Sequence, residues 1–305
     1  MTIPIVDAHH HIWRHADVPW LHGPAVPRIF GDYDALRRDY LIEEYAADCR
    51  PCGVVQSVYI QINVAPGDEI REVQAAAAEG AQCELVQGVV AFADLCAPDV
   101  GSVLDAQLEV GPVSGVRQQL HWHTDAAKSF ASRPDLILDG AFQRGLGELS
   151  RRNLLFELQL FPHQYDDAMT VVDRFPDTTF VLLHAGMSYD RTPDGVSTWA
   201  AGLAQVAERD NVIVKLSGLG TFAHECSSAV WQPIIAQTID TFGPTRCMFG
   251  SNFPIEKMWT SYAELVDVFL SAINDLGVDE RAAILHGTAR HAYRLPVPSQ
   301  ERTTT

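Results

Sequence analysis

The sequence predicts a single (β/α)8 barrel, and three observations lead to this prediction. Eight short runs rich in apolar and β-branched residues recur along the 305 residues, and segments with helical periodicity lie between most of them. Such alternation requires a parallel sheet covered by helices. Eight strand–helix units are also the number that closes a barrel. An open doubly wound sheet is the rival fold, but no glycine-rich phosphate turn follows the first run.

The expected strands are bounded by turn residues, and the expected helices carry an apolar stripe. In 163–175, for example, Ala168, Val171, Val172 and Phe175 recur at helical spacing. The expected strands are 5–13, 54–62, 86–94, 113–120, 154–160, 179–186, 211–219 and 246–254. The expected helices are 34–48, 67–82, 163–175, 194–209, 227–242 and 261–276, with one extra helix over 279–291. The barrel domain is thus expected over 1–295, followed by a polar tail, 296–305.

Composition and charge limit the classes of function. The chain is 47% apolar and 20% charged, which is typical of a globular protein. Its formal net charge of −17 disfavours binding to nucleic acid or to an anionic membrane. No apolar run reaches the roughly 18 residues that span a bilayer, and the first residues lack the basic region of a signal peptide. We therefore expect a cytoplasmic protein with a small-molecule substrate, and a homo-oligomer remains open.

Polar residues gather near the carboxyl ends of the expected strands, where barrels of this class place their chemistry. Their convergence on one mouth predicts a site, because a buried polar group without a partner costs about 1–3 kcal/mol. Alternation along each strand predicts the following inward side chains: Asp7, His9 and His11 on the first strand, Glu157 and Gln159 on the fifth, Phe180, Leu182 and His184 on the sixth, Lys215 and Ser217 on the seventh, and Asn252 on the eighth.

His9 and His11 are the sharpest local signal. Two imidazoles at i and i+2 on one strand face project in parallel, which suits one divalent ion. A third imidazole, His184, is expected at the end of the sixth strand. These three histidines are the expected metal ligands.

Four segments carry a resemblance to a known family. Val6–Trp13, Leu183–Gly186, Val214–Gly218 and Phe249–Pro254 resemble the amidohydrolase superfamily, in particular the amidohydrolase-2 branch with pyrone-dicarboxylate lactonase and the sugar-acid lactonases. The resemblance extends from Ile5 to about Leu295. It implies a distorted (β/α)8 barrel with its site at the mouth, and hydrolysis of a C–O bond in a small, usually anionic lactone. Some relatives instead isomerise lactones or decarboxylate unsaturated acids.

Two departures from the family pattern bear on mechanism. The residue that takes the proton from the attacking water in the family is an aspartate on the eighth strand, where this chain has Asn252. A carboxamide is not basic near neutral pH, so Asn252 is expected to orient a water or to bind a substrate hydroxyl. The fifth strand offers Glu157 and Gln159, where binuclear members place a carboxylated lysine or a histidine. We therefore expect at most one divalent ion, zinc or manganese, and possibly none.

The remaining candidates each have a structural alternative. Arg117 is suited to hold a substrate carboxylate, or it pairs with Glu157 inside the barrel. Lys215 meets a substrate anion, or it forms a buried salt bridge to Glu157. Other expected substrate contacts are Gln61, His123, Glu157, Gln159 and Trp20, the last as a cap on the pocket.

The expected reaction is hydrolysis of a lactone by water. The base is expected to be His184 or His121, because Asn252 cannot accept the proton. A lactone isomerase or a decarboxylase on the same barrel is the alternative, since an isomerase need not activate bulk water. A barrel that only binds its ligand is a third possibility.

Overall fold

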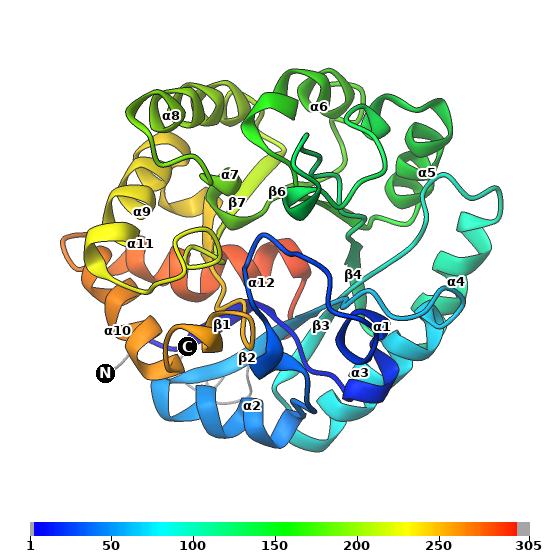
Figure 1. Ribbon diagram of the computed structural model, residues 1–305, viewed down its shortest axis with the longest axis horizontal. Coiled ribbons are helices and arrows are strands. Elements are labelled where there is room, and N and C mark those ends of the chain that lie inside the picture. The colour runs from blue at the N-terminus through cyan, green and yellow to red at the C-terminus, as the bar shows by residue number, and fades with distance from the viewer. Residues whose placement is uncertain (1–2, 298–305) are drawn as a thin grey trace.

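The computed structural model describes residues 3–297 and forms a ring of eight parallel strands (Figure 1). Hydrogen-bonded neighbours follow the order of the chain, and the bridge between His10 and Phe253 joins the last strand region to the first. The predicted (β/α)8 barrel is therefore confirmed. The strands are β1 (Ile5–His10), β2 (Val54–Ile60), β3 (Val86–Ala91), β4 (Val113–Val116), β5 (Leu155–Leu158), β6 (Phe180–Leu182), β7 (Val212–Leu216) and β8 (Cys247–Phe249).

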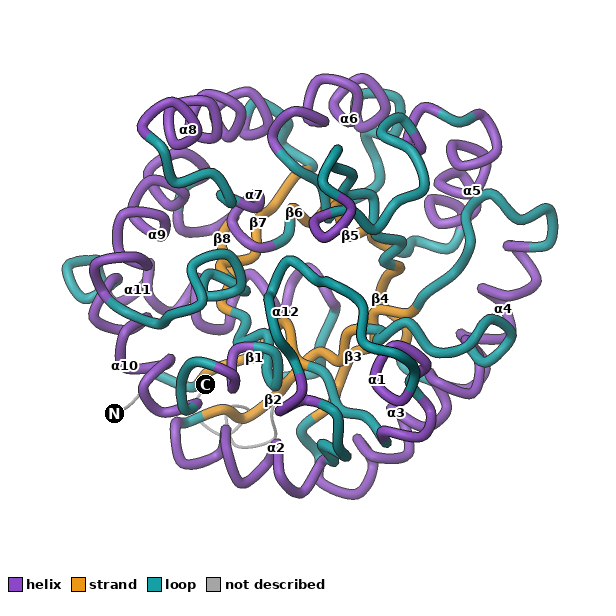
Figure 2. The backbone as a smooth tube through the Cα atoms, viewed as in Figure 1, coloured by secondary structure: helices purple, strands orange, loops and turns teal. Residues whose placement is uncertain are grey.

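Helices surround this ring, and loops cross above its centre (Figure 2). The longer helices are α2 (Ile42–Cys49), α3 (Glu69–Cys83), α4 (Val100–Val110), α5 (Gly140–Arg151), α6 (Tyr165–Val172), α8 (Pro193–Ala207), α9 (Ser228–Phe242) and α10 (Tyr262–Ala272). Shorter helices are α1 (Pro19–His22), α7 (His184–Met187), α11 (Val278–Ala282) and α12 (Thr288–Tyr293). No helix among the residues described is long and apolar enough to cross a membrane.

Two expected helices differ from the structure. The helix expected over 34–48 begins only at Ile42, because Tyr40 is extended and pairs with Trp13. The helix expected over 279–291 is divided into α11 and α12 by a π-helical turn, Ala283–Gly287. The expected polar tail lies outside the described residues from position 298 onward.

The barrel interior shows which side chains face inward. Val6, Ala8, Val181 and Leu183 belong to the inner apolar cluster, so the expected inward orientation of Asp7, Phe180 and Leu182 is wrong. Asp7 instead accepts hydrogen bonds from Tyr45 on α2 (2.9 Å) and Tyr262 on α10 (2.9 Å). An irregular register between Asp7 and His10 breaks strict alternation on this strand.

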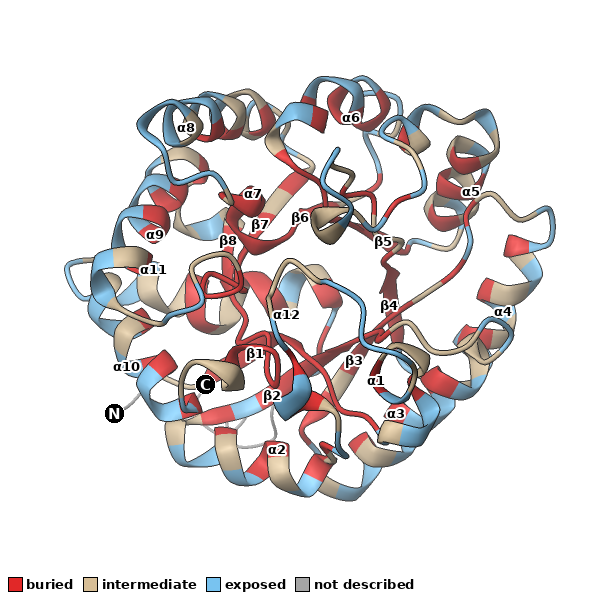
Figure 3. Cartoon of the chain, in the orientation of Figure 1, coloured by how far each residue is buried: buried red, intermediate tan, exposed pale blue. Residues whose placement is uncertain are grey.

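The amino end of the barrel is closed by α12. Tyr293 is buried inside the ring, and its hydroxyl donates to Glu157 Oε1 (2.7 Å). Ser114 on β4 donates to the Tyr293 carbonyl oxygen (3.0 Å). Figure 3 shows buried strands and inner helix faces within a rim of exposed helix surface. The open end for ligands is therefore the carboxyl end of the strands.

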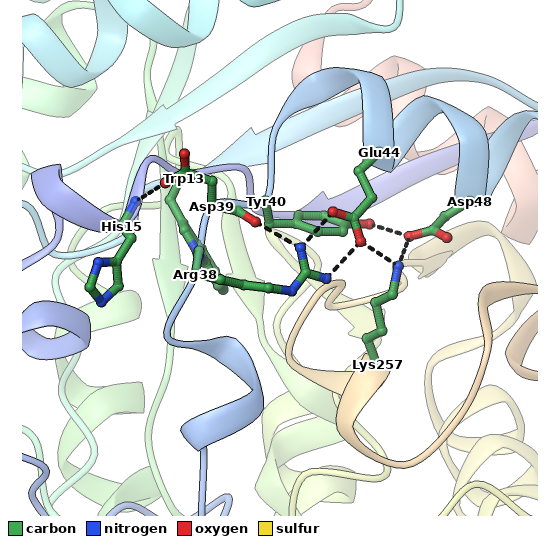
Figure 4. A network of polar contacts seen from close by, with 8 residues as sticks. All are labelled: Trp13, His15, Arg38, Asp39, Tyr40, Glu44, Asp48 and Lys257. Atoms are coloured by element: carbon green, nitrogen blue, oxygen red, sulfur yellow. Dashed lines mark hydrogen bonds and ion pairs between the residues drawn. The ribbon is translucent and has the colours of Figure 1, made fainter.

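A polar network fastens the first long loop and the loop after β8 to α2 (Figure 4). Arg38 donates to both oxygens of Glu44 (2.6 and 2.7 Å). Lys257 reaches Glu44 (2.8 Å) and Asp48 (2.6 Å), and Tyr40 donates to Asp48 (2.7 Å). These contacts hold in place two loops that contribute to the barrel mouth.

Candidate active site

A pocket that is partly open to solvent lies at the barrel mouth. Many of the residues expected from the sequence line it, and they come from strands far apart in the chain. The expected residues in its wall are His11, Trp20, Gln61, Arg117, His121, Gln159, His184 and Asn252. His9 lies against this wall, whereas His123, Glu157 and Lys215 do not line the pocket.

Three imidazoles meet at the inner end of the site: His11 and His184 line the pocket, and His9 contacts both. The His9 ring centroid lies 5.2 Å from that of His11 and 4.9 Å from that of His184. His11 Nδ1 donates to the carbonyl oxygen of Ile60 (2.8 Å), so its Nε2 carries a lone pair. Burial lowers the pKa of all three rings, that of His11 to about 3. The rings are therefore neutral at pH 7.

A buried ion pair lies behind His9. Lys215 Nζ is 2.6 Å from Glu157 Oε1, and both side chains are fully buried. This is the structural alternative that the sequence left open for Lys215. The ammonium also lies 3.5 Å from His9 Nδ1, and an ammonium can only donate. His9 therefore carries its ring proton on Nε2, an atom for which the described residues provide no hydrogen-bond partner.

Arg117 lines the pocket, and its hydrogen bonds go to uncharged groups. Its guanidinium donates to the carbonyl oxygen of Gln61 (2.7 Å) and to Gln159 Oε1 (3.4 Å). Burial lowers its pKa to about 10, so it remains charged at neutral pH. Its Nε has no partner among the residues described.

Two more cations line the pocket, and the sequence reasoning missed both. Arg28 lies over Trp20 (5.9 Å to the ring centroid) and Phe130 (5.6 Å), and Lys128 also lines the pocket. Arg28 comes from a loop and Lys128 from a three-residue helical turn, Ala126–Lys128, and neither has a periodicity that marks a residue as inward. The lining residues include no aspartate or glutamate. The pocket is thus cationic in a chain whose net charge is −17.

Asn252 lies in a short chain of hydrogen bonds at the mouth. Its backbone has φ +56° and donates to the His9 carbonyl oxygen (2.7 Å). Asn252 Nδ2 donates to Thr221 Oγ1 (3.2 Å), and Thr221 Oγ1 donates to Glu256 Oε1 (2.9 Å). The sequence reasoning missed Thr221 and Glu256. The four-residue spacing from Asn252 to Glu256 is the one signal that could have indicated the carboxyl.

A left-handed turn brings His184 to the site. Positive φ values run from His184 to Met187, and the Trp199 indole donates to the Ala185 carbonyl oxygen (2.7 Å). Gly218 makes room for the ring, because a Cβ at that position would lie 2.4 Å from His184 Nδ1. His184 Nδ1 is also 3.0 Å from Ser217 Oγ.

Comparison with known proteins identifies the family. The amidohydrolase family model matches residues 6–295. The chain belongs to the amidohydrolase family. This amidohydrolase is 32% identical to the protein y4mH of Sinorhizobium fredii, covering 96% of this chain and 99% of the relative. It is 29% identical to an L-fucono-1,5-lactonase of Burkholderia multivorans, covering 97% and 98%.

Solved structures place this amidohydrolase in the same family. A crystal structure of an amidohydrolase from Burkholderia multivorans with bound zinc has a TM-score of 0.81 and 26% identity, covering 96% of this chain and 100% of that one. A second crystal form of it holds bound HEPES. The protein is therefore an enzyme of a family in which zinc has been observed.

The three histidines allow the metal expectation to be tested on the geometry. Two imidazoles on one tetrahedral zinc have centroids roughly 5 Å apart, as His9 has from His11 and from His184. Within residues 3–297, however, no group of three or more histidine, cysteine, aspartate or glutamate side chains is arranged to hold an ion. His9 Nε2 also carries a proton in place of a lone pair. As arranged, these residues do not form a metal site.

The other expected residues of this amidohydrolase take several positions. Trp20 caps one side of the pocket and donates its indole N–H to the Ile62 carbonyl oxygen (2.9 Å). Burial lowers the pKa of His121 to about 3, which makes its ring a weak base. His123 accepts a hydrogen bond from the Asp125 backbone N–H (2.9 Å) and packs against Phe161.

Proposed function

We propose that this amidohydrolase hydrolyses the ester C–O bond of a small lactone that carries a carboxylate. One observation carries the proposal: three cations and no carboxylate line the pocket of a strongly acidic chain. Buried guanidinium groups favour carboxylates, which they bind with paired, charge-assisted hydrogen bonds. Similarity over nearly the whole chain to two L-fucono-1,5-lactonases of Burkholderia, at 29% and 25% identity, supports a lactone ring as the reacting group.

In the proposed reaction, water attacks the lactone carbonyl and negative charge develops on its oxygen. The Nε2–H of His9 would donate to this oxygen, and the Lys215 ammonium behind the ring would strengthen the donor. A prepositioned donor of this kind is worth about 10²–10³-fold in rate. Arg117 and Arg28 would hold the substrate carboxylate. The Asn252 carboxamide cannot take a proton, so its role would be to orient the water by hydrogen bonding.

The number of metal ions is part of the proposal. We expect at most one zinc or manganese ion per chain, with His9, His11 and His184 as the residues that would hold it. Its binding would be weak, because the His9 proton would first have to move from Nε2 to the other ring nitrogen. Elemental analysis of the purified protein should find no more than one equivalent, and two tightly held equivalents would contradict the proposal.

A matched substrate screen tests the activity. Lactones with and without a carboxylate should be compared in a pH-indicator assay, since hydrolysis releases acid. We expect faster turnover of the carboxylate-bearing member of each pair. Carbon dioxide release would indicate a decarboxylase, and a rearranged lactone without acid release would indicate an isomerase. Either result would reject hydrolysis.

Arg117→Gln tests the carboxylate contact. Loss of a charge-assisted hydrogen bond of about 1.5–3 kcal/mol should raise KM roughly ten- to a hundredfold. The effect should be confined to carboxylate-bearing lactones. Arg71→Gln, at an exposed ion pair with Asp68, serves as the control. Equal losses on charged and neutral lactones would remove Arg117 from carboxylate recognition.

A further inference from the structure

A buried carboxyl lies directly behind Asn252, outside the pocket wall. Glu256 is fully buried, although glutamate is among the residues least often buried without a partner. Its Oε1 accepts the hydroxyl proton of Thr221 (2.9 Å). Thr221 itself lines the pocket. One hydroxyl therefore connects this carboxyl to the space where substrate would bind.

The loop after β7 is shaped around the same carboxyl. A Cβ at Gly220 would lie 2.1 Å from Glu256 Oε2, so this position leaves room for the carboxyl only as glycine. Glu256 Oε2 has no hydrogen-bond partner among the described residues. The carboxyl is thus held close to Thr221 on one oxygen and retains capacity to accept a proton.

We propose that Glu256 takes the proton of the attacking water through the hydroxyl of Thr221, in place of the aspartate that the family resemblance expects at position 252. This inference rests on the proposed hydrolysis. Thr221 touches the reacting water, and Glu256 acts through it. Asn252 Nδ2 donates to Thr221 Oγ1, which fixes the hydroxyl with its proton directed at Glu256.

The proton transfers balance. As the water oxygen bonds to the lactone carbonyl carbon, one water proton moves to Thr221 Oγ1 and the Thr221 proton moves to Glu256. The tetrahedral intermediate then breaks its ring C–O bond. Glu256 returns the proton through Thr221 to the leaving alkoxide, which becomes the product hydroxyl. The new carboxylic acid releases its own proton to solvent, so no further reactant is needed.

The charge state of the carboxyl agrees with this role. Burial raises the pKa of Glu256 to about 7, and a base works best when its pKa lies near the working pH. The nearby imidazoles His11 and His121 have pKa values lowered to about 3. Burial raises the pKa of the neighbouring Cys226 thiol to about 11, so it stays protonated across this range.

Glu256→Gln and Thr221→Val test this proton relay, by which we mean proton transfer from the water through Thr221 to Glu256. Gln keeps an oxygen that can accept from Thr221, and Val keeps the shape of Thr without the hydroxyl. Each should lower kcat by about 10²–10⁴-fold with little change in KM, and Glu256→Gln should abolish the acidic limb of kcat near pH 7. Glu72→Gln is the matched control, because Glu72 is another buried glutamate whose pKa burial raises to about 7, and it lies outside this pocket.

Two further measurements separate the relay from a structural role and from a wrong function. Asn252→Asp in the Glu256→Gln background should restore hydrolysis, because a carboxylate then contacts the water directly. Infrared titration without substrate should show two carboxyls that protonate near pH 7. Folded Glu256→Gln should lose one of these signals, and Glu72→Gln should lose the other. If the wild type hydrolyses no lactone, the proposed function fails, whatever this titration shows. Unchanged kcat and pH profile in folded Glu256→Gln and Thr221→Val would overturn the relay.

Discussion

At the scale of single residues, Asn252 decides how this site differs from the family pattern. Asn252→Asp should keep or raise hydrolysis, since a carboxylate at this position can accept the water's proton directly. General-base assistance is worth about 10²–10⁴-fold, so a change is measurable in kcat. In an isomerase the same substitution would remove a donor, and the native reaction would fall.

Asn252→Ala completes this experiment. It removes the hydrogen bond to Thr221 and should lower kcat, because the hydroxyl loses its orientation. A merely structural Asn252 would instead lose stability and keep turnover in the folded fraction. Full activity in both variants would show that position 252 takes no part in the chemistry.

Gly218 controls the placement of one imidazole. Gly218→Ala puts a methyl group against His184 Nδ1 at a backbone with φ +60°. We expect a loss of about 1–2 kcal/mol in the free energy of unfolding and roughly a hundredfold loss of kcat, because small displacements of active groups are costly. Gly53→Ala is the control, since its φ is +88° and no atom lies within 4 Å of its Cβ. It should lose stability and keep turnover.

At the scale of elements, regular periodicity accounts for what the sequence could predict. All eight strands were predictable because each buries a short apolar run between turns. The prediction of which side chains point inward was wrong on β1, where the register is irregular between Asp7 and His10. It failed on β6 as well, where a left-handed turn beyond the strand delivers His184. Arg28 and Thr221 were missed because loops have no periodicity that predicts the direction of a side chain. Lys128 was missed because its three-residue helical turn is too short to show one.

The loop after β8 depends on its attachment to α2. Lys257→Met removes the ion pairs to Glu44 and Asp48 (Figure 4). The side chain is 30% exposed, so the expected loss in the free energy of unfolding is small, about 1 kcal/mol. Chemical denaturation measures it. Arg71→Met, at a more exposed pair, should change nothing measurable, and equal effects of the two variants would argue against the network.

At the scale of the whole molecule, buried titrating groups set the pH of greatest stability. Burial lowers the pKa of His9, His10, His11, His121 and His184. In the unfolded chain these histidines bind protons below pH about 6.5, whereas in the folded chain they stay neutral. The free energy of unfolding therefore decreases as pH falls below this value. Burial raises the pKa of Glu72 and Glu256 to about 7 and also raises that of Asp7. The stability these carboxyls contribute is lost as pH rises toward 7.

The histidines outnumber the carboxyls, so the free energy of unfolding should be greatest near pH 7 and fall steeply below pH 6. Each proton that the unfolded chain binds in excess of the folded chain changes the free energy of unfolding by about 1.4 kcal/mol per pH unit. Urea denaturation at a series of pH values measures the slope. In Glu72→Gln the stability relative to wild type should increase between pH 5 and 8, because the variant no longer ionises a buried group. A difference that is independent of pH would contradict the raised pKa of Glu72.

The hydrogen bond from Tyr293 to Glu157 has a consequence for synthesis. It spans 136 positions of the chain, and a ribosome adds only about 5–20 residues per second. Until α12 has left the ribosome, Glu157 lacks the hydrogen bond from Tyr293. The chain of contacts from Glu157 through Lys215 to His9 is then incomplete. Turnover should begin only when the last helix docks. The chain can accordingly be divided into two fragments just before α12. Activity that returns when the two fragments are mixed would measure their association.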